Sequence, residues 1–207
     1  MQSPTYVIKY RSSMDDEPPH IRLSPLGDEH IIHLLPLSGD PILLQTMGWK
    51  PFDSDEDERF LNYVQNVTVP NLFGGRTIAL AIVSADEDKP IGYLSLKGVR
   101  EGGTAAEIGI AIMDAEYRGR GLGTEALRLA AEYAFRELEV SHLVLTVFPD
   151  NVQAMRSYEK VGFKTTEVLK ESWELPDETF TDMWVMELTR DAFEQTQDRA
   201  SSSANSH

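Results

Sequence analysis

Cysteine is absent from the 207 residues. Without thiols the chain forms no disulfide, and it has neither a thiolate nucleophile nor a thiolate metal ligand. Long apolar runs are also missing: no segment approaches the roughly 18 consecutive apolar residues that a membrane-spanning helix needs. The first twenty residues lack the basic start and apolar core of a secretory signal peptide. These absences predict a cytoplasmic protein with no membrane partner.

Positive charge is scarce, because 19 Lys and Arg residues face 34 Asp and Glu residues, for a formal net charge of −15. Non-specific nucleic-acid binding needs a basic face, so the balance argues against a nucleic-acid partner and leaves room for cationic ones. The five histidines show no paired metal spacing apart from His30 and His33, and we predict no metal site. Hydrophobic residues make up 41% of the chain, enough to build a core.

The chain divides into three parts by composition. Residues 1–19 are polar, end in Pro18-Pro19 and are expected to form an arm. Residues 20–190 alternate helical and strand patterns, and residues 191–207, with a Ser-rich end, are expected to be largely disordered. Strands are predicted over 21–26, 77–83, 91–99, 105–113, 142–148, 164–175 and 180–188, and helices over 28–35, 53–66, 122–138 and 151–161.

A glycine-rich loop, Arg118-Gly119-Arg120-Gly121-Leu122-Gly123, joins the strand at 105–113 to the helix at 122–138. Glycines permit tight turns and bring backbone amides close to a ligand, and a helix start offers unpaired amides and a partial positive charge. With the two arginines, this favours a phosphate or diphosphate. A plain strand-to-helix connection is the alternative; the loop has neither the Walker nor the Rossmann spacing.

A second motif lies about thirty residues further along, at Asn151, Ala154, Tyr158, Lys160 and Gly162-Phe163. Together with Arg118, Gly121 and Gly123 of the loop, it resembles the GNAT acetyltransferases. The opening strand Ile-Arg-Leu-Ser-Pro-Leu at 21–26 and the Trp173 region are similar to the subgroup of ribosomal-protein-alanine and spermidine acetyltransferases. The resemblance covers about residues 20–190.

The resemblance implies a single α/β (α+β) domain with a mixed, mostly antiparallel sheet of six or seven strands and about four helices. In this family acetyl-CoA lies between two parallel strands that splay apart, here 105–113 and 142–148. The residues implied to bind it are Ala111, Ile112, Met113, Arg118, Gly119, Arg120, Gly121, Leu122, Gly123, Thr124, Asn151 and Lys160. Among these, the strand residues would offer free backbone groups to the pantetheine arm, and the loop amides would hold the pyrophosphate.

Two residues are implied to be catalytic. Tyr158 would protonate the thiolate that leaves, and Glu107 is the candidate base that takes a proton from the amine. A strand amide at Ile112 or a neighbour would stabilise the oxyanion. Taken alone, Tyr158 also fits a core aromatic, Glu107 an outward-facing strand residue, and Asn151 a helix cap.

The sequence therefore predicts an acetyl-CoA-dependent N-acetyltransferase that acts on a primary amine by direct attack, without a covalent enzyme intermediate. A small cationic amine such as a polyamine is the first choice of acceptor, because of the charge and the resemblance. A protein or peptide N-terminus is the alternative, and a non-catalytic acyl-CoA-binding module is a different class of answer. A nucleotide at the glycine loop is a third option, and a homodimer is left open.

Overall fold

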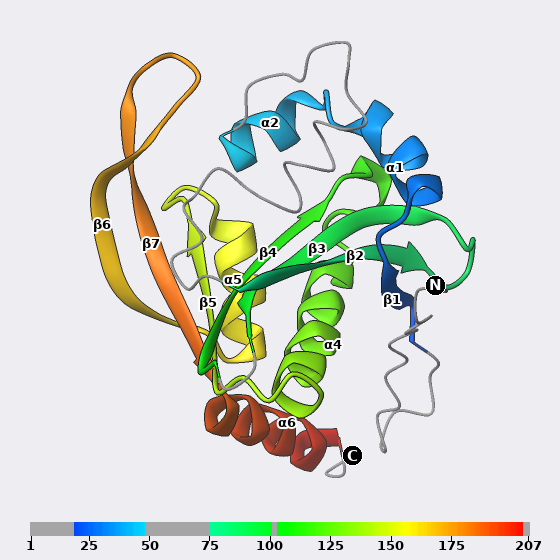
Figure 1. The fold of residues 1–207 in the computed structure, drawn as a ribbon, viewed down its shortest axis with the longest axis vertical. Coiled ribbons are helices and arrows are strands. Elements are labelled where there is room, and N and C mark those ends of the chain that lie inside the picture. Colours follow the sequence, from blue (N-terminus) through cyan, green and yellow to red (C-terminus); the bar gives the residue numbers. More distant parts are fainter. Residues whose placement is uncertain (1–18, 49–74, 101–102, 205–207) are drawn as a thin grey trace.

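The computed structural model describes residues 19–48, 75–100 and 103–204 (Figure 1). Seven strands form one sheet in the order β1-β2-β3-β4-β5-β7-β6. The strands are β1 (Ile21–Pro25), β2 (Arg76–Ser84), β3 (Pro90–Val99), β4 (Ala105–Ile112), β5 (His142–Val147), β6 (Lys164–Glu174) and β7 (Phe180–Thr189). Only β4 and β5 pair in parallel; the other neighbours in this sheet are antiparallel. The predicted fold class is confirmed.

Helices cover both faces of the sheet (Figure 1). In the described part of the chain they are α1 (Asp28–Leu34), α2 (Pro41–Met47), α4 (Leu122–Arg136), α5 (Val152–Val161) and α6 (Arg190–Ala204), with 3-10 turns η1 (Leu35–Leu37) and η2 (Ala115–Tyr117). Apolar side chains of α4 and α5 pack on one face in the main core, while α1 and α2 pack on the other against Tyr93, Ala111 and Met113. Since both faces are covered, β3 is buried along its whole length.

The parallel pair β4–β5 separates soon after it begins. Its ladder has three pairs, from Ala105–His142 to Glu107–Val144. Beyond that point β4 still pairs with β3 as far as Ile112, and β5 still pairs with β7 as far as Val147. The two strands therefore diverge inside one continuous sheet, and a gap opens between their carboxyl ends.

The C-terminal stretch differs from the expectation of a largely disordered tail, because residues 190–204 form α6. Phe193 is buried, with its ring centroid 5.6 Å from that of Phe135 on α4. The Arg190 guanidinium donates to the carbonyls of Phe135 and Val140. One aromatic anchor and one arginine thus fix the start of a helix whose remaining residues are mostly polar.

The short helix α2 was not predicted, although its signals are present. Asp40 caps it, accepting from the Leu43 N–H at 2.7 Å, and Pro41 occupies its first turn. The predicted helix over 53–66 and all but the last residue of the predicted arm at 1–19 lie outside the described residues. In the described part of the chain, no helix has the length and apolar character needed to cross a membrane.

Candidate active site

A large pocket of about 710 Å³ lies where β4 and β5 separate. Its walls come from α2, the end of β4, the glycine loop, the start of α4 and one side of α5. The predicted residues that line it are Ala111, Ile112, Arg118, Gly119, Gly121, Gly123, Thr124, Asn151, Tyr158 and Lys160. The structure thus gathers the two sequence motifs around one cavity.

Three predicted cofactor residues do not line this pocket. The Met113 and Leu122 side chains are buried in the cores, and Arg120 is an exposed cation 5.3 Å from the centroid of the Tyr117 ring. Conversely, Ile42, Thr46 and Met47 of α2 line it and were not anticipated, because that helix was missed. No group of three or more His, Asp or Glu side chains among the described residues is placed to hold a metal ion.

The glycine loop reaches α4 through two residues with left-handed backbone. Gly119 has φ of +74° and Gly121 has φ of +84°. A Cβ at Gly121 would meet no atom within 4 Å, so the backbone angle rather than crowding favours glycine there. Gly121 also caps α4 and supplies no side-chain acceptor. The first-turn amides of α4 therefore remain free to bind an anion at the edge of the pocket.

Arg118 is committed to the protein rather than free for a phosphate. Its guanidinium donates to the carbonyls of Ile112 (2.9 Å) and Met113 (2.6 Å) and to the Asp40 carboxylate (2.8 Å). The bond from Arg118 holds the pKa of the Asp40 carboxyl below its ordinary value. This arginine therefore joins the glycine loop to the end of β4 and to the cap of α2, which carries part of the pocket wall.

Backbone direction along β4 refines the predicted cofactor contacts. The Met113 N–H donates to the Ile91 carbonyl of β3, whereas the Thr104 carbonyl accepts from the Ser141 and His142 N–H groups on the β5 side. Because strand residues alternate in direction, the N–H groups of Ile110 and Ile112 face the gap, and those of Ala111 and Met113 face β3. Of the three predicted strand residues, Ile112 is the one whose amide is directed at the gap.

Replacing Asp40 by alanine is expected to lower the free energy of unfolding by about 1 kcal/mol, because α2 loses its cap and Arg118 loses a partner. Asp40→Asn keeps an oxygen for the Leu43 amide and is expected to lose about half as much. Urea denaturation of the three proteins measures both values. Equal losses in the two variants would assign the effect to the Arg118 contact rather than to the cap.

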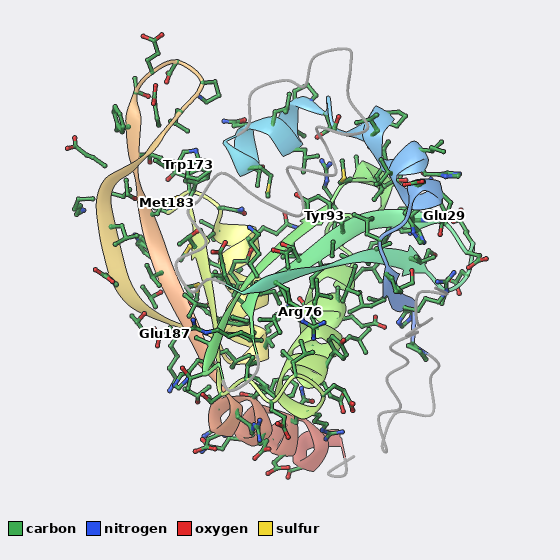
Figure 2. All side chains as sticks on the ribbon, in the orientation of Figure 1. Glu29, Arg76, Tyr93, Trp173, Met183 and Glu187 are labelled. Atoms are coloured by element: carbon green, nitrogen blue, oxygen red, sulfur yellow. The ribbon has the colours of Figure 1, made fainter. Side chains whose placement is uncertain are left out.

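A small chamber of about 110 Å³ adjoins the large pocket. The two cavities share Thr46, Met47, Ile110, Asn151 and Tyr158. The chamber is further lined by Tyr93, Ser95, Lys97, Glu107, Ile108, Gly109, Thr146, Val147, Phe148, Trp173 and Met183. Tyr93, Trp173 and Met183 are marked in Figure 2, on β3, β6 and β7. Residues far apart in the sequence thus line a second pocket beside the first.

Tyr158 lies at the junction of the two cavities. It is 8% exposed, and its ring centroid is 6.0 Å from that of Phe163, so it also packs in the core. Burial raises the pKa of its phenol to about 12. The hydroxyl therefore keeps its proton throughout the neutral range and is a hydrogen-bond donor there. Asn151, close by, caps α5 by accepting from the Ala154 N–H at 3.2 Å.

Glu107 lines the small chamber and is paired with Lys97, whose Nζ lies 3.3 Å from Glu107 Oε1. The Lys97 side chain is 5% exposed and that of Glu107 is 16% exposed. Burial lowers the pKa of the Lys97 ammonium, and the Glu107 carboxylate opposes that decrease. Lys97 was missed by the sequence analysis, although a lysine inside an apolar strand is a signal that a buried partner exists.

Trp173 lines the same chamber and carries a donor that has no partner in the described part of the chain. Its Nε1 is buried and has no acceptor among the described residues. The indole stands edge-on to Phe148, with ring centroids 6.0 Å apart, and a Cβ at Gly48 would approach both rings to less than 3 Å. Of the other two tryptophans, Trp184 packs on the main core and Trp49 lies outside the described residues.

Comparison with known proteins agrees with this geometry. The acetyltransferase (GNAT) domain model matches residues 20–164. Spermidine N(1)-acetyltransferase of Escherichia coli K12 is 37% identical over 82 residues, which are 40% of this chain and 43% of that protein. Aminoglycoside N(6′)-acetyltransferase type 1 of Klebsiella pneumoniae is 34% identical over 85 residues, 41% and 39% of the two chains. The matched part thus spans less than half the length of these curated relatives.

A solved structure shares the fold. The spermidine N-acetyltransferase from Vibrio cholerae, in complex with CoA and spermine, matches with a TM-score of 0.69 at 19% identity, over 84% of this chain and 98% of that one. The family model covers well over half of the sequence, and the splayed strands and glycine loop lie within it. The chain belongs to the GNAT acetyltransferase family, as its two motifs predicted.

Proposed function

We propose that the protein is an acetyl-CoA-dependent N-acetyltransferase that acts on a primary amine. The observation that carries this proposal is the meeting of two cavities at the Tyr158 side chain, one beside a phosphate-type loop and one beside a carboxylate. Such a junction would bring a thioester from one side next to an amine from the other. The family of the chain and the acetyltransferases it resembles support the same activity.

The large pocket fits acetyl-CoA in size and chemistry. Its volume of about 710 Å³ lies within the usual range for ligand sites. The first-turn amides of α4 would hold the pyrophosphate, with Lys160 on the pocket wall as a cation. The Ile112 N–H group would pair the open edge of β4 with the pantetheine arm. Acetyl-CoA would supply an acetyl group already activated as a thioester.

The residues of the chain then account for the proton transfers. Glu107 accepts a proton from the ammonium, and the neutral nitrogen bonds the acetyl carbon as the carbon–sulfur bond breaks. The Ile110 N–H faces the gap on a residue that lines both cavities, and it donates to the carbonyl oxygen, where negative charge develops. Tyr158 protonates the sulfur. Of the two protons that leave the nitrogen, one finally resides on the thiol and the other passes to solvent, so no covalent enzyme intermediate is needed.

Three observations bear on the acceptor. The net charge of −15 and the spermidine acetyltransferase relatives support a polyamine. The buried Lys97 ammonium in the small chamber argues against a polycation at that point, since like charges repel strongly where water is scarce. A peptide N-terminus and an aminoglycoside also carry the required primary amine.

A panel of primary amines with acetyl-CoA, read as released thiol, tests the proposal on the purified chain. We expect at least one amine to be acetylated, and calorimetry to detect binding of coenzyme A more tightly than of ATP. Binding of coenzyme A without turnover of any amine would favour the non-catalytic module instead. Tighter binding of ATP would favour a nucleotide at the glycine loop.

A further inference from the structure

The small chamber is electrically balanced before any substrate enters. Among the described residues that line it, it contains one buried cation, Lys97, and one carboxylate, Glu107, with Nζ and Oε1 3.3 Å apart. An acceptor that brings only positive charge must compete with Lys97 for Glu107, and it leaves the lysine beside a like charge. An acceptor that brings one charge of each sign preserves the balance.

Two residues on the chamber wall carry hydrogen-bond donors that lack a full set of acceptors among the described residues. Trp173 Nε1 is buried and without an acceptor among the described residues. Lys97 carries three N–H donors, and its one side-chain bond in the described structure goes to Glu107. A buried donor without a partner costs about 1–3 kcal/mol. A polyamine has only nitrogen donors when protonated, whereas an acceptor with a carboxylate supplies the missing oxygens.

The chamber volume suits a small acceptor group. A cavity of about 150 Å³ is enough to hold benzene, a molecule with six non-hydrogen atoms. At about 110 Å³, walled by Phe148 and Trp173, the chamber accommodates a group of similar or smaller size. Glycine, alanine and β-alanine are in that range.

We propose, building on the acetyltransferase function proposed above, that the acceptor is a small amino acid whose ammonium meets Glu107 and whose carboxylate meets Lys97 and the Trp173 indole N–H. The amine is the group acetylated, by the proton transfers already described. The carboxylate does not react; it fixes the amine beside Tyr158, where the thioester from the large pocket ends. Lys97 and Trp173 are therefore specificity-determining residues.

The test compares matched acceptors on the wild-type protein. Glycine is paired with methylamine and β-alanine with ethylamine, each pair differing only in the carboxylate; glycinamide, β-alaninamide and spermidine complete the set. The rates of thiol release are expressed per neutral amine, which removes differences in amine pKa. We expect kcat/KM for each amino acid to exceed that of its partner by about thirtyfold, with the amides between them, as loss of a hydrogen bond to a charged group predicts.

The results of this test distinguish a wrong acceptor from a wrong enzymatic function. Equal rates within each pair, or spermidine as the best acceptor, would overturn the amino-acid assignment and leave an acetyltransferase. No turnover of any acceptor, with coenzyme A still bound, would overturn both.

Three variants locate the carboxylate. In Lys97→Met the amino acid is expected to react at most about threefold faster than its partner without a carboxylate. In Trp173→Phe, which keeps an aromatic wall, the preference is expected to be about one fifth of the wild-type value. Trp184→Phe, a tryptophan outside the chamber, serves as the matched control and is expected to retain the full preference. Calorimetric binding of coenzyme A verifies the fold of each variant. Unchanged preferences in Lys97→Met and Trp173→Phe would show that the carboxylate binds elsewhere.

Discussion

Tyr158→Phe is expected to lower kcat by at least about a hundredfold, the lower end of what a positioned general acid contributes. The substitution removes one oxygen from a side chain that lines both cavities and leaves its ring against Phe163. Packing is thus retained, and only the proton donor to the departing sulfur is lost. The affinity for coenzyme A, measured by calorimetry, is expected to stay within about twofold because the phosphate contacts are untouched.

The pH profile adds a second readout for the same residue. Because burial raises the pKa of Tyr158 to about 12, the phenol loses its proton only under strongly alkaline conditions. Activity should therefore rise with pH as more amine becomes neutral, with no decline from Tyr158 between about pH 7 and pH 10. A falling limb near pH 9 that disappears in Tyr158→Phe would contradict a buried phenol.

Tyr133→Phe is the matched control for the hydroxyl deletion. Tyr133 lies on α4, is half-buried against the main core and lines neither cavity. Its replacement is expected to change kcat by less than about threefold, since Tyr133 lines neither cavity. A comparable decrease in both variants would mean that Tyr158 acts through stability rather than through proton transfer.

The local parts of the site were predictable from the sequence because short motifs encode them. The glycine loop needs left-handed residues at fixed positions, and Gly119 and Gly121 adopt that conformation. Likewise, Asn151 caps α5 and Gly162 ends it, as the motif spacing indicates. Alternation and helical periodicity were enough to predict the seven strands and their approximate limits.

Long-range pairings were not predictable in this way. Arg118 looks like a phosphate ligand in the motif, yet its guanidinium is held by Asp40, 78 positions earlier in the chain, and by two carbonyls of the strand end. The Lys97–Glu107 pair depends on the register of β3 with β4, which places the two residues directly opposite one another. The pattern of residues within one strand does not specify how that strand aligns with its neighbour. A lysine in an apolar strand indicates only that a buried counter-charge exists somewhere.

The largest effect on the acceptor side is expected for Glu107→Gln. At pH 7 an aliphatic amine with a pKa of about 10.4 is neutral in only about one molecule in 2,500, so a base beside it matters. Glutamine keeps the shape of Glu107 but cannot accept the proton, and kcat/KM should fall by about 10²- to 10⁴-fold. Initial rates with the best acceptor of the panel measure this, and a loss below about threefold would mean that water or another group removes the proton.

Glu107→Gln also leaves the buried Lys97 ammonium without its counter-charge, which is expected to lower the free energy of unfolding by about 3 kcal/mol. A loss of activity in that variant alone could therefore reflect instability. In the double variant Lys97→Met/Glu107→Gln neither charge remains, so most of the stability should return, as measured by urea denaturation. Activity should not return with it, because the base is still missing. Recovery of both together would reduce Glu107 to a structural partner of Lys97, whereas stability without turnover identifies its carboxylate as the group that takes the proton.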